Sequence, residues 1–183
     1  MTFDRKGIHM RATRILSLIL IALILPALAL AEGKKIPRLS ITDLEGKKHD
    51  VKEFLGEGPV LLNFWATYCK PCLAELPKIE AFQKEWAEET GLKLITVSID
   101  QPRMQKQVRP FVHRHGFKFP VYTDSNQEAL RKLGGRGVPF NVLIGTDGSI
   151  LDAHAGFKAS DTETWAALIL EDAAAHAVEE SDE

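Results

Sequence analysis

The two cysteines of the chain, Cys69 and Cys72, stand two residues apart, directly after an apolar run. Such a C-x-x-C pair can form a structural disulfide, supply half of a metal site, or act as two thiols that are oxidised and reduced in turn. A bridge across so short a loop constrains the unfolded chain little. A structural zinc ion requires four ligands, and no histidine stands at close metal-ligand spacing to the pair. The pair therefore favours redox chemistry over the other two, with no bound metal and no cofactor.

Two predicted elements position this pair. Residues 59–66 form a nearly continuous apolar run, which is typical of a strand buried on both faces. Apolar side chains then recur at helical spacing from about residue 70 to residue 90, and Gly91 can end this helix. The dithiol thus lies where a buried strand turns into a helix.

The start of that helix predicts different roles for the two cysteines. Cys69 lies at the helix N-terminus, where unpaired N–H groups and the helix dipole stabilise a thiolate. Lys70 adds positive charge beside this thiol and Pro71 stiffens the first turn, so both are expected to tune its pKa. Cys72, one turn later, is expected to be more buried. We therefore predict that Cys69 attacks the substrate and that Cys72 resolves the intermediate.

The remaining elements alternate between strand and helix patterns, which predicts an α/β sandwich with a mixed sheet. Turn residues at 146–149 mark a hairpin between two late strands. The expected elements are a hairpin around Glu45 and Gly46, strands at 92–100 and 119–124, a helix at about 104–115, a short helix capped by Ser125 and running through Leu133, strands at 139–145 and 150–156, and a last helix at about 162–177 capped by Asp161.

The N-terminus has a different composition. Basic residues precede an apolar run at residues 15–25, Pro26 breaks the run, and an Ala-x-Ala sequence ends at Ala31. This pattern predicts a secretory signal cleaved after Ala31, with an uncleaved membrane anchor as the alternative and Met10 as an alternative start. The predicted organisation is a signal or anchor at 1–31, a linker at 32–37, one domain at 38–177 and an acidic tail at 178–183.

Export would place the domain in the periplasm or at the extracytoplasmic face of the inner membrane, where disulfides persist. Without residues 1–31, acidic residues outnumber basic ones. This balance argues against a nucleic acid or an anionic membrane surface as partner.

Three short motifs resemble a known family. "FWATYCKPC" resembles the thioredoxin active site, and "CLAELP" is similar to the TlpA/ResA-type thiol:disulfide oxidoreductases of the bacterial envelope, whose glutamate after the second cysteine matches Glu75. "GVPFNVLI" matches the second signature of the family, a cis-proline before a strand, at Val138 and Pro139. The resemblance covers about residues 38–174 and includes a helix–strand insertion near residues 104–122.

The resemblance implies a thioredoxin-like sandwich, in which helices flank a central mixed sheet with an N-terminal hairpin and a central helix–strand insertion. It implies an extracytoplasmic thiol:disulfide oxidoreductase that reduces protein disulfides, for example in cytochrome c maturation. Its partners would be protein thiol or disulfide substrates and a membrane thiol electron donor. We expect the protein to be a monomer.

The resemblance also assigns roles to single residues. Glu75 would exchange protons with the dithiol, and Trp65, Val138 and Pro139 would bind the substrate. Each has a plainer alternative: an exposed helix acid for Glu75, core packing for Trp65, and an ordinary trans bond for Pro139. A threonine-containing pair is common where this chain has Phe140-Asn141, and that departure leaves the substrate preference open.

Two other functions fit a cysteine site on this scaffold. A peroxidase of the same superfamily carries its reactive cysteine in a Thr-x-x-Cys context without C-x-x-C, and Thr67 stands only two residues before Cys69. A copper-handling protein would need a histidine that faces the cysteines and a wider cysteine spacing. Both alternatives fit this sequence less well than the oxidoreductase.

Overall fold

The computed structural model describes residues 33–181, and the fold lies within the unit Lys34–Glu183. The predicted signal or anchor lies outside the described residues, so it stays a prediction. Among the helices of the described part, none is both long and apolar enough to cross a membrane.

Within the described residues, seven strands form one mixed sheet in the order β2-β1-β5-β4-β3-β6-β7. The central strand β3 pairs in parallel with β4 and antiparallel with β6. All six residues of β3 are buried, as its continuous apolar run predicts. The strands are β1 (Ser40–Asp43), β2 (Lys48–Asp50), β3 (Val60–Trp65), β4 (Lys93–Ser98), β5 (Val121–Thr123), β6 (Phe140–Ile144) and β7 (Ile150–Ala155).

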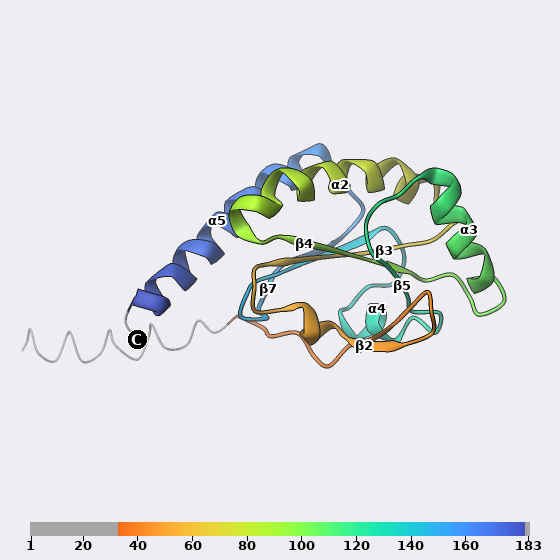
Figure 1. The fold of residues 1–183 in the computed structure, drawn as a ribbon, viewed down its shortest axis with the longest axis horizontal. Helices are drawn as coiled ribbons and strands as arrows, with labels where there is room; N and C mark the ends of the chain where they lie inside the picture. Colours follow the sequence, from red (N-terminus) through yellow and green to blue (C-terminus); the bar gives the residue numbers. More distant parts are fainter. Residues whose placement is uncertain (1–32, 182–183) are drawn as a thin grey trace, which may run out of the picture. The chain divides into compact units, whose positions relative to one another are not determined.

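Helices cover both faces of this sheet. In Figure 1, α2 and α5 lie together over one face and α4 lies on the opposite side. The rings of Phe82 on α2 and Trp165 on α5 are 5.9 Å apart, so the two helices share one apolar contact. The helices are α2 (Lys70–Thr90), α3 (Gln105–His115), α4 (Glu128–Lys132) and α5 (Ala159–Ser181), with a 3₁₀ turn η1 (Val51–Phe54) after β2.

Most predicted elements are confirmed. The β1–β2 hairpin, the α3–β5 insertion and the β6–β7 hairpin are all present. Helix α2 ends where predicted, because Gly91 adopts the left-handed conformation (φ 69°) that glycine tolerates best. The fold is therefore the predicted α/β sandwich.

Two helix starts differ from prediction. Ser125 does not cap α4, and its hydroxyl is buried without a hydrogen-bond partner among the described residues. The Asp124 carboxylate instead accepts hydrogen bonds from the backbone N–H groups of Glu128 (2.9 Å) and Leu130 (3.0 Å). Helix α5 begins at Ala159, so Asp161 lies in its first turn and does not precede it.

The prediction of a linker at residues 32–37 is wrong for residues 33–37, which the structure describes. The backbone N–H of Ile36 donates to the carbonyl of Gly148 (2.9 Å), and Ile150 donates to the carbonyl of Lys34 (2.8 Å). The side chain of Ile36 is buried in the core. This segment is therefore packed along the β6–β7 turn and belongs to the domain.

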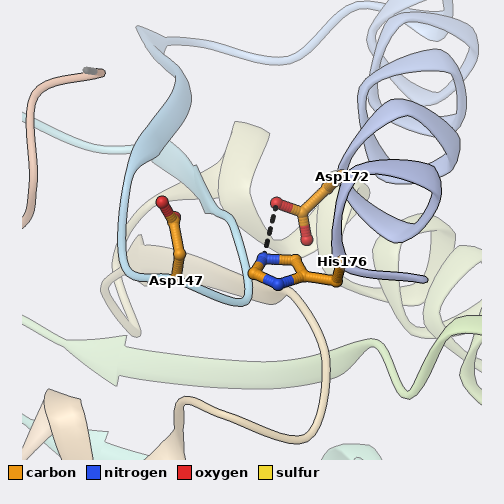
Figure 2. A group of neighbouring side chains, drawn as sticks. All are labelled: Asp147, Asp172 and His176. Atoms are coloured by element: carbon orange, nitrogen blue, oxygen red, sulfur yellow. Dashed lines mark ion pairs between the residues drawn. The ribbon is translucent and has the colours of Figure 1, made fainter. Parts of the chain in front are cut away.

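The same turn is tied to α5 by a small polar cluster. Figure 2 shows Asp172 and His176 on α5 and Asp147 on the turn, with an ion pair of 3.9 Å between Asp172 and His176. The oxygen and nitrogen atoms that these three side chains could offer to a metal ion lie within 4.8 Å of one another. Both carboxylates are already engaged, because Asp147 pairs with Lys35 and buried Asp172 accepts from the N–H and hydroxyl of Thr146 (2.9 and 2.7 Å). The cluster thus serves as a clamp between the helix and the turn.

Candidate active site

Cys69 and Cys72 are joined by a disulfide at the start of α2. Cys69 is the N-cap residue, and its sulfur accepts a hydrogen bond from the backbone N–H of Cys72 (3.3 Å). Cys69 is 7% exposed and Cys72 is 1% exposed. The predicted position of Cys69 at the helix start and the deeper burial of Cys72 are both confirmed. Lys70 and Pro71 follow on the exposed first turn.

The loop that leads into the dithiol is anchored to the sheet by Asp100. This carboxylate is buried, and it accepts hydrogen bonds from the backbone N–H of Thr67 (3.0 Å), the Thr67 hydroxyl (2.6 Å) and the Ser98 hydroxyl (2.6 Å). Because β3 and β4 are parallel, their carboxyl ends lie at the same edge of the sheet. The hydroxyl proton of Thr67 is thus directed to Asp100. Asp100 was not predicted from the sequence, where its only signal is an acid two residues after a buried strand.

Trp65 and Tyr68, two aromatic residues before Cys69, have opposite environments. Tyr68 is 63% exposed beside the dithiol, and sequence reasoning assigned it no role. Trp65 is fully buried and packs against Phe111 and Phe117, with ring centroids 6.0 and 6.3 Å away. A side chain without exposed surface offers no contact to a docked substrate in this disulfide form. The substrate contact predicted for Trp65 therefore does not fit, and the alternative of core packing does.

Glu75 lies one turn after Cys72 on α2 and is 2% exposed, which excludes the alternative of an exposed helix acid. One carboxylate oxygen accepts hydrogen bonds from the side-chain amides of Asn141 (2.6 Å) and Asn63 (3.2 Å). The other oxygen has no partner among the described residues. Burial raises the pKa of Glu75 to about 7, although the hydrogen bond from Asn141 acts in the opposite direction.

The two asparagines that hold Glu75 come from neighbouring strands. Asn63 on β3 and Asn141 on β6 are register partners, and the Asn63 amide donates to the Asn141 side-chain oxygen (2.8 Å). Both are fully buried. Asn141 also donates to the backbone carbonyl of Gly156 (3.2 Å). Sequence reasoning noted Asn141 only as a departure from the family pattern and missed Asn63, although an amide inside an apolar strand was a usable signal.

The Val138–Pro139 bond is cis, as predicted. Pro139 is buried directly before β6, while Val138 is partly exposed. Two residues further on, Asn141 contacts Glu75, so the start of β6 lies next to the first turns of α2. The structure thus brings the proline segment close to the helix that carries the dithiol.

Comparisons with known proteins agree on one family. Residues 33–153 match the AhpC/TSA family. The thiol-disulfide oxidoreductase ResA of Bacillus anthracis is 37% identical over 124 residues, which are 68% of this chain and 69% of that protein. The ResA of Geobacillus kaustophilus is 31% identical over 128 residues, which are 70% of this chain and 71% of that protein.

Solved structures share the fold. A thioredoxin-like protein from Porphyromonas gingivalis is 30% identical, with a TM-score of 0.63 over 74% of this chain and 92% of that chain. StoA from Bacillus subtilis is 23% identical, with a TM-score of 0.57 over 72% of this chain and 97% of that chain. The second likeness concerns the fold alone.

Proposed function

This chain belongs to the AhpC/TSA family, has a thioredoxin-like fold and is a thiol-disulfide oxidoreductase, and on that premise we propose that it reduces disulfides of other proteins outside the cytoplasm. The single observation that carries the proposed direction is the buried carboxyl of Glu75, one turn after Cys72. The proposed location rests on the basic and apolar pattern of residues 1–31.

The first step uses Cys69. In the reduced enzyme its thiolate, stabilised at the N-terminus of α2, attacks one sulfur of the substrate disulfide. A mixed disulfide forms between Cys69 and that sulfur, and the other substrate sulfur leaves as a thiolate that takes a proton. Cys72 stays reduced during this step.

The second step uses Cys72 and Glu75. Glu75 takes the proton of the Cys72 thiol, and the resulting thiolate attacks the Cys69 sulfur. The substrate leaves as its second thiolate, and the enzyme retains the Cys69–Cys72 disulfide. Two electrons thus pass from the enzyme to the substrate, and a dithiol donor at the membrane would return them. A carboxyl with a pKa of about 7 suits this proton transfer near neutral pH, where a well-placed group contributes ~10²–10⁴-fold.

Glu75 also bears on the direction of electron flow. A dithiol is strongly oxidising when its reduced form is stabilised as a thiolate. A carboxylate near the pair opposes a stable thiolate at either cysteine, so the dithiol gives up electrons more readily. This favours a reductant. The similarity to proteins named thiol-disulfide oxidoreductase supports thiol–disulfide exchange, and we propose cysteines of proteins such as apocytochrome c as the groups that are reduced.

The substrate would dock beside the exposed side of the dithiol. Tyr68 offers a large exposed ring next to Cys69. Val138 is partly exposed before β6, and its backbone would pair with an extended substrate segment as an added strand.

Variants of the two cysteines test the mechanism. Cys72→Ser is expected to accumulate mixed disulfides with substrate proteins, and Cys69→Ser is expected to abolish reduction of insulin disulfides without trapping them. Trapping by Cys69→Ser in place of Cys72→Ser would reverse the assignment. Equilibration with a glutathione series tests the direction, and a potential as oxidising as about −120 mV would refute a reductant.

A further inference from the structure

A row of polar side chains extends the Glu75 site across the sheet. Asn63 on β3 pairs with Asn141 on β6, and Asn141 pairs with His154 on β7. Directly paired residues of neighbouring strands point to the same face of a sheet. Asn63 and Asn141 both reach Glu75, so His154 is the next residue of the row that lies under the helices.

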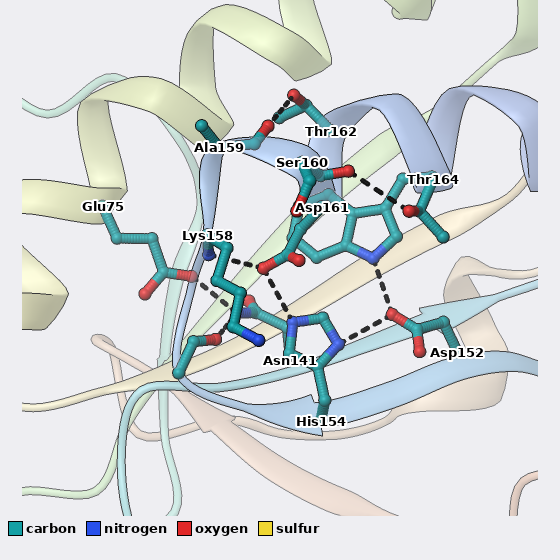
Figure 3. A network of polar contacts seen from close by, with 12 residues as sticks. Glu75, Asn141, Asp152, His154, Lys158, Ala159, Ser160, Asp161, Thr162 and Thr164 are labelled. Atoms are coloured by element: carbon teal, nitrogen blue, oxygen red, sulfur yellow. Dashed lines mark hydrogen bonds and ion pairs between the residues drawn. The ribbon is translucent and has the colours of Figure 1, made fainter.

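His154 lies between two carboxylates. Figure 3 shows its ring between Asp152 on β7 and Asp161 on α5. The Nδ1 atom lies 2.8 Å from the Asp152 carboxylate, and the Nε2 atom lies 3.1 Å from the Asp161 carboxylate. An imidazole that faces carboxylates at both nitrogens donates two hydrogen bonds only in its doubly protonated, cationic form. In that form the ring would donate one hydrogen bond to each carboxylate and would carry a positive charge.

The cluster is held firmly in place. Trp165 donates from its indole N–H to Asp152 (2.8 Å), and its ring stacks on that of His154 at 5.9 Å. The backbone N–H of Lys158 donates to Asp161 (2.6 Å). The side chain of His154 is 30% exposed, so the cluster lies between the buried site and solvent.

The charges of this cluster act on Glu75 in opposite directions. The positive charge of His154 lowers the pKa of Glu75, and the negative charge of Asp161 raises it, both by less than the effect of burial. Other charged residues on the neighbouring elements include Asp152 on β7, Lys158 directly before α5, and Lys78 on α2, whose ammonium lies 5.7 Å from the ring centre of Phe157.

We propose that His154 and Asp161 are positioning residues that set the ionisation of Glu75, His154 by favouring the carboxylate and Asp161 by favouring the carboxylic acid. Neither has a contact with the cysteine sulfurs among the interactions of the described residues. Any effect of His154 and Asp161 on the rate of disulfide reduction rests on the proposed proton transfer by Glu75. Their effect on the ionisation of Glu75 does not rest on it.

The titration of Glu75 can be followed directly in the oxidised protein. Carbon-13 NMR of labelled glutamate carboxyls, with Glu75→Gln to assign the signal, gives the midpoint pH. His154→Gln is expected to raise this midpoint and Asp161→Asn to lower it, each by a few tenths of a pH unit to about one unit. Both variants alter the same contact between β7 and α5, so mere loosening of that contact would move both midpoints in one direction.

A second histidine of the chain provides a matched control. His49 also faces two carboxylates, Asp43 at 3.0 Å and Glu53 at 3.3 Å, but it lies on β2 at the opposite edge of the sheet. His49→Gln is expected to leave the Glu75 midpoint unchanged. An equal shift in that variant would overturn the inference.

The remaining outcomes are equally decisive. Unchanged midpoints in both test variants, or shifts in the same direction, overturn the coupling. Opposite shifts establish it, even if the pH profile of insulin reduction does not follow them. In that last case the coupling stands and the proposed proton transfer by Glu75 fails, so the two hypotheses are tested separately.

Discussion

Replacing Glu75 with glutamine is expected to change how the stability of the oxidised protein depends on pH. The carboxyl has an ordinary pKa of 4.5, and burial raises it to about 7 in the folded protein. Between these values the folded protein binds a proton that the unfolded chain has released. The free energy of unfolding therefore falls as pH rises through this range.

The size of this effect follows from the difference between the two pKa values. The stabilisation is fully present below pH 4.5 and is lost once the pH has passed about 7. At 1.36 kcal/mol for each unit of pKa difference, the loss amounts to about 3 kcal/mol. Glutamine does not titrate, and its side-chain oxygen can still accept from Asn141 and Asn63, so the variant should not show this loss.

Urea unfolding of both proteins, from below pH 4.5 to above pH 7, measures the effect. The variant is expected to gain about 3 kcal/mol relative to wild type across this range, because Glu75 alone differs between them. Glu88→Gln removes an exposed carboxyl from the same helix and serves as the control. Parallel stability curves for wild type and Glu75→Gln would refute a buried carboxyl with a raised pKa.

Three further predictions concern other parts of the chain. Asp172→Ala should lower the free energy of unfolding by about 1.5–3 kcal/mol in urea titrations, because buried Asp172 accepts two hydrogen bonds from Thr146. A change below about 0.5 kcal/mol, as for a surface substitution, would contradict this. Pro139→Ala should raise the activation free energy of insulin reduction by more than it lowers the free energy of unfolding. Equal changes in the two free energies would show a structural role only. A phosphatase fused after Glu183 should be active if residues 1–31 direct export, and an inactive fusion would count against it.

Local signals in the sequence determined most elements and the dithiol. The apolar run before Cys69 specifies β3, and Gly91 ends α2 because it tolerates the left-handed conformation. The helix start at Cys69 follows from equally local signals, so one sequence suffices to predict these features. The cis bond at Pro139 was expected from the match to the family motif.

The two exceptions among the elements have different causes. Ser125 and Asp124 can both act as helix caps, and the carboxylate of Asp124 takes the hydrogen bonds. The linker prediction failed because residues 34–36 pair with the β6–β7 turn, which is distant in the sequence.

The surroundings of Glu75 were decided by the tertiary structure alone. Asn63 and Asn141 are 78 residues apart in the chain, and they meet because β3 and β6 pair in one register. A shift of that register by one residue would turn the Asn141 side chain to the other face of the sheet. Only the assembled sheet and the helices over it bury Glu75, and burial is what raises its pKa. The sequence by itself thus determined the dithiol, and the folding of distant strands under α2 determined the carboxyl that we propose to serve it.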